Sequence, residues 1–534
     1  MKKIACIILS AVTAIALMAV PARRDGFIRT AADGTEKMVF LHGNETFHYL
    51  TDAEGNWLDE ETLLPLSQEV KAAREQAGKA RVQARRIQEQ KKIGGELNLA
   101  PRGLIILVSF KDKAFSTPYD TINNMINGEH FTRSYTTTVL SPTYGKQQKT
   151  ITASGSARQY FQDQSWGQYN PVFDVVGPVT VSENVSYYGS NNYYGDDKNV
   201  DKMIKEACTL ANTECNVDYT LYDNDNDGKV DFVYFIYAGY GEADSDKSST
   251  IWPHNYDYTY YGNTTLRFDG KIIANYACSN ELESTNDNYA GIGTFCHEFS
   301  HVLGLPDLYA TNNSTHHTLV DWDILDYGPY NNDGNTPPAY SAYERFYMGW
   351  LTPRVLTDPE YVWLNPLNGS KEALIISSTD AHNLVGNDPN PKDFYIIECR
   401  KKTGWDEYLP GKGMLITHIR YDANKWLNNT VNNSSSNMGV DIVEAKSNTT
   451  SGKSKTTDAY PAGSTQWVGL EGHEVTNITL QEEGGAVTFS YRDAEPNDVE
   501  TVQRDDVQST KVIRDGKLLI IRNGIIYDIT GRQL

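Results

Sequence analysis

Long apolar runs, cysteine and positive charge are all scarce in this sequence of 534 residues. Beyond the extreme N-terminus, no apolar run reaches the length of about 20 residues that a membrane-spanning helix needs, which excludes a multi-pass membrane protein. Lys and Arg number 48 against 69 Asp and Glu, so the formal net charge is −21. Because nucleic acid is bound through clustered basic residues, this acidic balance argues against nucleic acid as a partner.

Cysteine is scarce as well, with six in the chain and no CxxC pair among them. Cys6 lies in the N-terminal apolar run. The other five form an odd, widely spaced set that is no disulfide framework: Cys208, Cys215, Cys278, Cys296 and Cys399. The sequence therefore indicates neither a cysteine zinc site nor a thioredoxin-type redox site.

The N-terminus has the pattern of a secretory signal peptide over residues 1–22. Two lysines precede an apolar run over residues 4–20, and Val20-Pro21-Ala22 offers small residues for cleavage before Arg23. A membrane anchor is the alternative, which the shortness of the run disfavours. We therefore expect a secreted protein with no transmembrane anchor after signal removal.

The next segment, residues 23–100, combines short alternating runs typical of hairpins with a charged stretch over residues 67–92. That stretch predicts a solvated helix with dibasic pairs, and it is followed by Gly94-Gly95. Exposed basic helices before a glycine linker are where proteases nick chains, although an ordinary interdomain spacer fits the composition equally well.

A larger unit follows over residues 101–352. Two of its apolar runs, Leu104–Val108 and Val230–Tyr237, are apolar on both alternating faces, which predicts central strands of a buried sheet. The composition of this unit alone does not indicate what it does.

The C-terminal third has a different pattern. Residues 353–492 contain short strands with turn residues about every ten positions, which predicts an all-β sandwich. An acidic linker over residues 493–510 then precedes a final hairpin around Asn523-Gly524, within residues 511–534.

The segment 279–304 has helical periodicity and contains His297-Glu298-x-x-His301. Two histidines at i and i+4 face the same side of a helix and can bind one zinc ion together. At about 100° per residue they lie outside the apolar stripe, so the core face and the metal face are separate. Glu298 would lie beside the metal, where its carboxylate can take a proton from water. The apolar stripe consists of Ile292, Phe295, Phe299, Val302 and Leu303.

Gly304 and Asp307 extend this pattern. Gly304 follows the last apolar residue, where a left-handed turn would end the helix. Such a turn would bring Asp307 back toward the metal as a third protein ligand, with the fourth position left for water, as catalytic zinc sites require. Two structural histidines are the alternative; HExxH alone arises by chance in about one chain in a hundred of this length, and the added Gly and Asp make chance less probable still.

The extended motif, His297-Glu298-x-x-His301-x-x-Gly304-x-x-Asp307, resembles that of the M6 peptidases, the immune inhibitor A-like zinc metalloendopeptidases. Segments 231–242, 251–254, 321–328 and 338–350 are similar to the same family, and the resemblance covers roughly residues 102–490. It implies a multidomain protein: an α+β zincin catalytic domain of the metzincin type, with an N-terminal propeptide and the C-terminal β-sandwich. It also implies protein or peptide substrates.

The sequence departs from the family at one position. M6 enzymes usually read Trp-Asp-x-Met in the turn beneath the metal, and this chain has Leu325. Because the two side chains have similar volumes, the exchange should cost less than ~1.5 kcal/mol. Tyr327 matches the tyrosine that in some metzincins leans toward the metal, where its hydroxyl would stabilise a tetrahedral intermediate. A packed turn tyrosine fits equally well.

A second metal site is predicted in an acidic loop. Asp223, Asp225, Asp227 and Asp231 stand at positions 1, 3, 5 and 9 of the loop, with Gly at position 6. Oxygen ligands at this spacing bind calcium, and the glycine permits the sharp turn. Tyr234 occupies position 12, which excludes a full EF-hand and favours a dockerin-like half loop with a structural Ca²⁺. A solvated acidic turn is the alternative.

The two ends of the chain carry weaker resemblances. Residues 35–58 resemble the propeptide of the same family, which implies latency, although the group that blocks the zinc is left open between His42, His48 and an acid. Residues 516–532 resemble a type IX secretion sorting domain of the Bacteroidetes. This implies transit through the periplasm, recognition by secretion machinery, and release outside the cell or attachment to its surface.

The sequence thus predicts a secreted, zinc-dependent endopeptidase that is made as a zymogen. A secreted adhesin or glycan-binding protein with a vestigial zinc site is the main alternative, against which the intact Glu298 argues. A zinc enzyme that acts on a non-peptide bond is a second alternative. Only an assay on protein substrates, with chelator controls, distinguishes it from an endopeptidase.

Overall fold

The computed structural model describes residues 20–494 and 510–527, with internal gaps. The gaps are residues 25, 32, 45–46, 60–61, 75, 77–99, 142–144, 192–196, 246, 259–264, 284–287, 313, 449–452, 515–516 and 523–524. Most of the predicted signal peptide, the dibasic pairs and nearly all of the acidic linker lie outside the described residues. Within the described part of the chain, no helix is long and apolar enough to cross a membrane.

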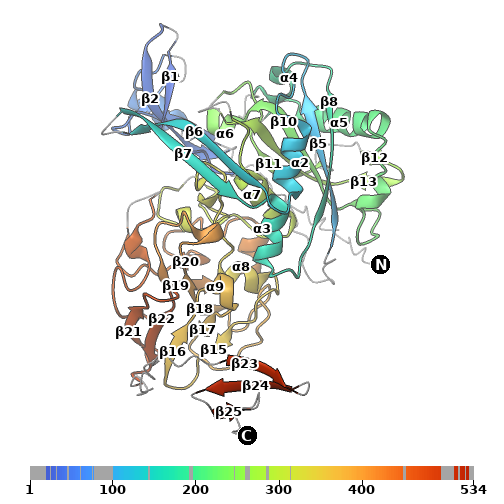
Figure 1. Cartoon of the computed structure of the whole chain (residues 1–534). Helices are drawn as coiled ribbons and strands as arrows, with labels where there is room; N and C mark the ends of the chain where they lie inside the picture. The colour runs from blue at the N-terminus through green and yellow to red at the C-terminus, as the bar shows by residue number, and fades with distance from the viewer. Residues whose placement is uncertain are drawn as a thin grey trace, which may run out of the picture.

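A five-stranded sheet lies at the centre of the unit that begins at Arg102 (Figure 1). Its order is β11-β14-β10-β5-β8, with parallel neighbours except for β11, which pairs antiparallel with β14. The strands are β5 (Arg102–Ser109), β8 (Val172–Thr180), β10 (Val233–Tyr240), β11 (His254–Asp257) and β14 (Asn275–Leu282). The prediction of buried strands at Leu104–Val108 and Val230–Tyr237 is confirmed, although residues 229–230 form a separate short strand, β9.

Helices cover both faces of this sheet because β5 is apolar on both. Leu104 and Ile106 pack in the cluster that contains α5 (Val200–Glu214). Ile105 and Leu107 point the other way, into a cluster to which the three longer helices on this side contribute. These are α2 (Tyr119–Asn127), α3 (Ala157–Gln164) and α7 (Gly293–Val302). The remaining short helices and turns of this unit are α4 (Val185–Gly189), η1 (Tyr219–Tyr222), α6 (Glu242–Ser245), η3 (Val320–Trp322), η4 (Gly328–Tyr330) and α8 (Ala342–Tyr347).

The predicted helix over residues 279–304 is wrong in its first part. Residues 279–282 belong to β14, where they pair with β10 and are buried on both faces, and this tertiary setting overrides the local helical periodicity. Helix α7 begins only at Gly293. Its end follows the prediction: Gly304 is left-handed, with a φ of 94°. The Leu305 amide donates to the carbonyl of Ser300 at 3.1 Å, which closes a Schellman turn.

The C-terminal part contains two sheets. One has the order β15-β17-β18-β19-β20 and the other β16-β22-β21. Their strands are β15 (Arg354–Val355), β16 (Glu360–Leu364), β17 (Leu374–Ile376), β18 (Asp393–Arg400), β19 (Gly413–Arg420), β20 (Val440–Ile442), β21 (Val475–Leu480) and β22 (Val487–Tyr491), with α9 (Leu367–Ser370), η5 (Gly404–Asp406), α10 (Ala423–Leu427) and η6 (Thr456–Asp458) between them. One hydrophobic cluster joins both sheets. On the other face of β18 and β19, Phe394, Ile396 and Leu415 belong instead to the cluster around α7. The two parts therefore share a core.

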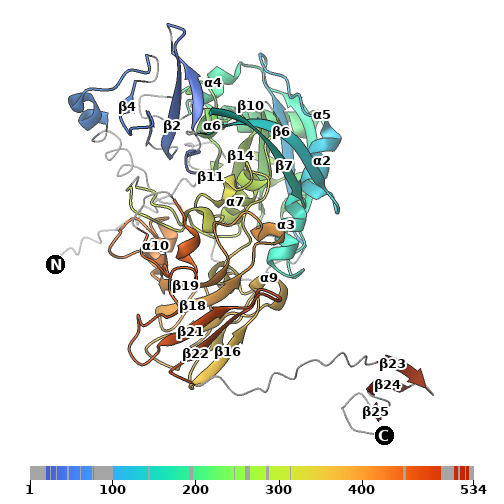
Figure 2. The ribbon, with the colours of Figure 1, turned by 60° about the vertical axis from the view of Figure 1, so that its left-hand side comes forward.

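Three smaller sheets and one hairpin complete the fold. The N-terminal sheet confirms the predicted hairpins and consists of β1 (Phe27–Thr30), β2 (Glu36–Asn44), β3 (Phe47–Thr51) and β4 (Trp57–Leu58). A long hairpin, β6 (Thr132–Ser141) with β7 (Gly145–Ser154), reaches toward this sheet in Figure 1. Strands β12 (Arg267–Phe268) and β13 (Lys271–Ile273) pair beside β9 (Lys229–Val230). Strands β23 (Thr510–Arg514), β24 (Lys517–Arg522) and β25 (Ile525–Tyr527) confirm the predicted C-terminal hairpin and lie apart from the other sheets in Figure 2.

Candidate metal centre

Two histidines of α7 and one aspartate from the following segment converge at a buried point. His297 Nε2 and His301 Nε2 lie 3.1 Å apart. Asp307 Oδ1 lies 3.2 Å from the first of these nitrogens and 3.3 Å from the second. The side chains of all three residues are fully buried. The spacing of the two histidines and the turn at Gly304 thus bring the three side chains together.

Backbone carbonyls fix the orientation of both imidazole rings. His297 Nδ1 donates to the carbonyl of Ile324 at 2.7 Å, and His301 Nδ1 donates to that of Leu305 at 2.8 Å. A carbonyl can only accept, so Nδ1 carries the proton in each ring, and each Nε2 presents a lone pair. Burial lowers the pKa of His297 below its ordinary value, which favours this neutral form.

Asp307 is held from the C-terminal part of the chain. Asn429, which follows α10, donates through Nδ2 to Asp307 Oδ2 at 2.6 Å, and its Oδ1 accepts from the Asp307 amide at 2.7 Å. This leaves Asp307 Oδ1, a buried acceptor with no hydrogen bond, directed at the two imidazoles.

The donor set fits a zinc ion. Two nitrogen lone pairs and a carboxylate oxygen that face one another repel unless a cation lies between them. Ligand atoms at about 2.0–2.1 Å from a tetrahedral zinc lie about 3.3–3.4 Å from one another. The three separations found here, 3.1, 3.2 and 3.3 Å, match that triangle closely. Among the described residues, His297, His301 and Asp307 form one of two groups that could hold a metal ion.

Glu298 follows the first histidine and is fully buried on α7. Its Oε1 accepts a hydrogen bond from the backbone amide of Val20 at 3.0 Å. Val20 is itself buried, and its carbonyl accepts from the Trp252 indole at 3.1 Å. The N-terminal segment of the described chain therefore passes directly in front of this carboxylate.

The turn beneath the histidines follows η3. Its Leu325 is fully buried, and the Leu325 carbonyl accepts from the Leu308 amide at 2.8 Å. The hydrogen bond from His297 to the Ile324 carbonyl adds a second link. The turn is thus bonded both to α7 and to the segment that carries Asp307. Leucine thus fills the position where the resemblance leads one to expect methionine.

Tyr327, the sequence candidate for stabilising the intermediate, lies under the N-terminal segment. The Arg24 guanidinium stacks over its ring at 3.2 Å from the ring centroid. Burial raises the pKa of Tyr327 above its ordinary value. Its ring contacts Arg24 and Tyr309 and packs in a cluster with Val320 and Tyr330. None of these described contacts is with the two histidines or Asp307.

The histidines that the sequence offered as blocking groups lie elsewhere. His42 Nε2 is 2.9 Å from the Thr51 hydroxyl, and His48 Nε2 is 3.3 Å from Glu242 Oε1. Neither of these described contacts involves the metal centre. The segment that contacts Glu298 is instead Val20–Arg24. Most of this segment was predicted to belong to the signal peptide.

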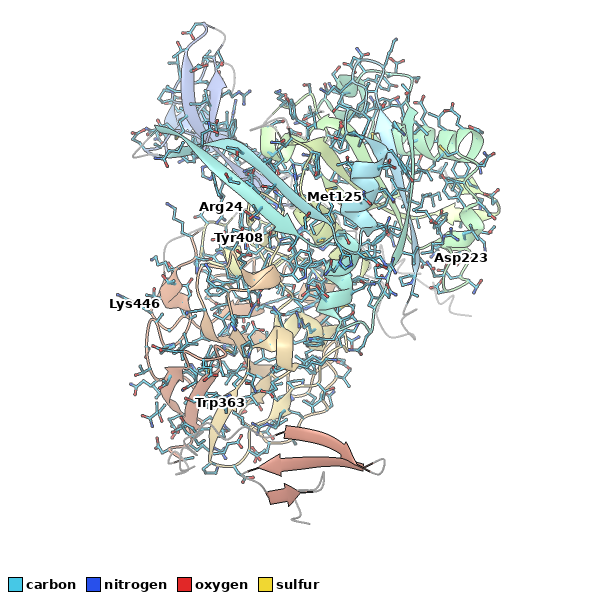
Figure 3. All side chains as sticks on the ribbon, in the orientation of Figure 1. Arg24, Met125, Asp223, Trp363, Tyr408 and Lys446 are labelled. Carbon is cyan, nitrogen blue, oxygen red and sulfur yellow. The ribbon has the colours of Figure 1, made fainter. Side chains whose placement is uncertain are left out.

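The acidic loop is only partly assembled as predicted. Ligand oxygens of Asp223, Asp225 and Asp227 lie within 4.8 Å of one another. Asp231 is not in this group, because its Oδ2 accepts from the amide and side chain of Asn224 at 2.6 and 3.1 Å. Lys271 Nζ lies 2.6 Å from Asp223 Oδ2 and neutralises part of the charge. Figure 3 labels Asp223 and Arg24 on opposite sides of the unit that contains the five-stranded sheet.

Sequence reasoning missed Asn429 and the Val20–Arg24 segment. Asn429 lies 122 positions from Asp307, and Val20 lies 278 positions from Glu298. An asparagine-rich stretch around residues 428–433 was the only local signal for the first. The sequence holds no local signal for the packing of the Val20–Arg24 segment. A small-residue cleavage pattern is the same whether or not the chain packs in a cleft.

Comparison with known proteins finds a family model that matches the region of the candidate metal centre. Residues 97–351 match the family model described as immune inhibitor A peptidase M6, catalytic domain. The chain is 26% identical over 220 residues to Pre-pro-metalloprotease PrtV of Vibrio cholerae serotype O1, which covers 36% of this chain and 23% of that protein. It is 26% identical over 221 residues to Immune inhibitor A of Bacillus thuringiensis subsp. alesti, which covers 34% of this chain and 30% of that protein. The chain therefore spans less than a third of the length of these curated relatives.

Proposed function

Residues 97–351 belong to the M6 metallopeptidase family, and from this premise we propose that the chain is a secreted, zinc-dependent endopeptidase that is made as a zymogen. Its substrates are extracellular proteins or peptides. The observation that carries the proposal is the triangle of His297 Nε2, His301 Nε2 and Asp307 Oδ1, with its three sides between 3.1 and 3.3 Å.

The three side chains of this triangle would hold the zinc ion. Bound zinc supplies a Lewis acid that polarises the scissile carbonyl and acidifies water. Glu298 accepts a proton from the attacking water at its carboxylate and later returns it to the leaving amine. Its full burial supports this role, because a carboxylate out of bulk water exchanges protons with the reacting groups. Tyr327 can join the reaction only after Arg24 leaves its ring.

Latency is supported by the path of the N-terminal segment. The amide of Val20 is hydrogen-bonded to the Glu298 carboxylate, and the Arg24 guanidinium covers the ring of Tyr327. A substrate therefore cannot reach either side chain while the segment is in place. If a signal peptidase cuts before Arg23, the Val20 contact is lost at export and residues 23–100 remain as the propeptide. N-terminal sequencing of the secreted protein distinguishes cleavage there from cleavage earlier in the chain.

The finer assignments follow the sequence analysis. We assign a zincin of the metzincin type to the catalytic unit and a β-sandwich to the two C-terminal sheets, whose shared cluster supports that packing. The proposed division is a signal peptide (1–22), a propeptide (23–100), a catalytic domain (101–352), a β-sandwich (353–492), a linker (493–510) and a sorting segment (511–534). A structural Ca²⁺ in the loop of Asp223, Asp225 and Asp227 is part of the same proposal.

Casein hydrolysis by the Glu298→Ala variant tests the function. We expect wild type to cleave casein, a zinc chelator to abolish cleavage, and Glu298→Ala to lose at least about 10³-fold in rate, because it lacks the group that moves the proton. Glu482→Ala, at an exposed glutamate of the C-terminal part, is the matched control and should keep full activity. Equal turnover by Glu298→Ala and wild type would contradict the mechanism.

A further inference from the structure

The N-terminal segment is bound in the cleft through its backbone, as an extended substrate would be. Besides the contacts of Val20, the carbonyl of Pro21 accepts from the Tyr330 hydroxyl at 2.6 Å. The Arg23 amide donates to the carbonyl of Ala243 at 3.0 Å. The Ala22 amide donates at 2.8 Å to the carbonyl of Gly43 in β2, which belongs to the proposed propeptide and not to the cleft. In each of these bonds the segment contributes a main-chain group. The bonds therefore do not depend on which side chains the segment carries.

The side chain of Arg23 is the exception, because it enters a buried acidic pocket. Its guanidinium makes a short ion pair with Asp333 and lies 3.6 Å from Glu283 Oε2. All three side chains are less than a tenth exposed. We call the pocket formed by Glu283 and Asp333 the acidic pocket. Arginine suits it because its planar guanidinium can pair with more than one carboxylate oxygen.

The walls of the acidic pocket hold Asp333 in place from outside the N-terminal segment. The Tyr135 hydroxyl of β6 donates to Asp333 Oδ2 at 3.0 Å. Gly334 brings its backbone so close to Glu283 that a Cβ there would lie 3.3 Å from Oε1. The pocket is therefore built by β6, the end of β14 and the turn after η4, all of which remain when the N-terminal segment departs.

The charges of the pocket require a cation. Burial and the neighbouring Asp333 raise the pKa of Glu283 to about 8. Burial also acts on Asp333, but Arg23 holds the pKa of that carboxyl below its ordinary value, so Asp333 carries the negative charge at neutral pH. Asp244 adds a third acid nearby. Arg133, the other cation beside the pocket, is bonded to Asn335 and to the Tyr289 carbonyl. Loss of Arg23 leaves a buried carboxylate without its cation, which is unfavourable.

We propose that the acidic pocket of Glu283 and Asp333 is a substrate subsite that selects an arginine or lysine side chain, and that Arg23 occupies it as a substrate mimic. The inference rests on the proposed endopeptidase function. Arg23 is three positions from Val20, whose amide meets Glu298, and an extended chain covers about 10 Å in that distance. The preferred basic residue therefore lies at one fixed position close to the cut bond.

Cleavage profiling of the activated enzyme tests the subsite. A peptide library digested by wild type should show Arg and Lys enriched at one position near the cuts. Asp333→Asn should reduce that enrichment about tenfold or more while cleavage of neutral peptides continues, because asparagine keeps the shape but not the charge. Asn also tolerates the left-handed backbone at this position, where φ is 57°. Asp358→Asn, at an exposed site far from the cleft, is the control.

A second measurement does not depend on activity. In the full-length chain, Arg23→Ala empties the pocket, and agmatine, a free guanidinium compound, should raise its melting temperature by a few degrees while leaving wild type unchanged. Arg23→Ala combined with Asp333→Asn should show no such shift. Uniform cleavage without basic preference, or an agmatine shift that survives Asp333→Asn, would overturn the proposal. If wild type cuts no peptide at all, the proposed function fails, and the agmatine result alone decides whether the pocket binds a basic group.

Discussion

Asn429 binds Asp307 at two points, accepting from its backbone amide at 2.7 Å and donating to its carboxylate at 2.6 Å. This pair links the C-terminal β-rich part of the chain to the candidate metal centre. The hydrophobic cluster around α7 also includes residues of β18 and β19. The C-terminal part therefore contributes directly to the geometry of the candidate site.

Replacing Asn429 should weaken zinc binding without removing a ligand. In Asn429→Ala, Asp307 loses the donor that orients its carboxylate, and outer-shell partners of this kind are typically worth 10–100-fold in metal affinity. We expect a loss of about that size in a competition titration against a chelator. The control is Asn424→Ala, at an exposed position of α10. Equal zinc affinity in the two variants would show that the contact does not position the ligand.

Acidification should loosen the N-terminal sheet. Burial, with a smaller contribution from Arg24, lowers the pKa of His42 to about 4, whereas a released His42 would titrate near 6.5. Between these two pH values His42 binds a proton when the sheet is released but stays neutral when the sheet is packed. The free energy of releasing the sheet therefore falls as the pH drops from about 6.5 to about 4.

Hydrogen exchange of the β2 and β3 amides measures this effect. We expect exchange of these amides to be faster at pH 4.5 than at pH 7, after correction for intrinsic rates, and the difference to shrink in His42→Gln, which stays neutral at both pH values. A difference of the same size in wild type and His42→Gln would show that another group is responsible.

Gly293 should tolerate no side chain. A Cβ at this first residue of α7 would lie 1.9 Å from the carbonyl oxygen of Pro329, which is backbone and cannot swing aside. We expect Gly293→Ala to lower the free energy of unfolding by about 2–4 kcal/mol, measured by denaturant titration. Gly369→Ala, in α9, has open space around its Cβ and should cost little. Similar losses in the two variants would mean that α7 adapts its start.

Calcium removal tests the acidic loop. If Asp223, Asp225 and Asp227 bind Ca²⁺, dialysis into a calcium-free buffer that contains zinc should lower the melting temperature by several degrees, and Asp225→Asn should abolish this sensitivity. The same melting temperature with and without added Ca²⁺ would mean that Lys271 alone compensates the loop.

Local features of the site could be predicted from the sequence, and distant ones could not. The histidines, the turn at Gly304 and the return of Asp307 all lie within a short stretch, where helical geometry and glycine conformation decide the outcome. Residues 279–282 were misassigned because sheet pairing overrode their local pattern. Asp231 was expected in the calcium group but bonds to Asn224 instead, since a loop can satisfy one carboxylate in more than one way.

The zinc-edge anomalous difference map of crystals of the protein tests the central claim most directly. We predict one strong peak at about 2.0–2.1 Å from each of His297 Nε2, His301 Nε2 and Asp307 Oδ1. A map with no peak between these atoms, or a refined structure in which the three side chains face apart, would contradict the assignment of a catalytic zinc centre.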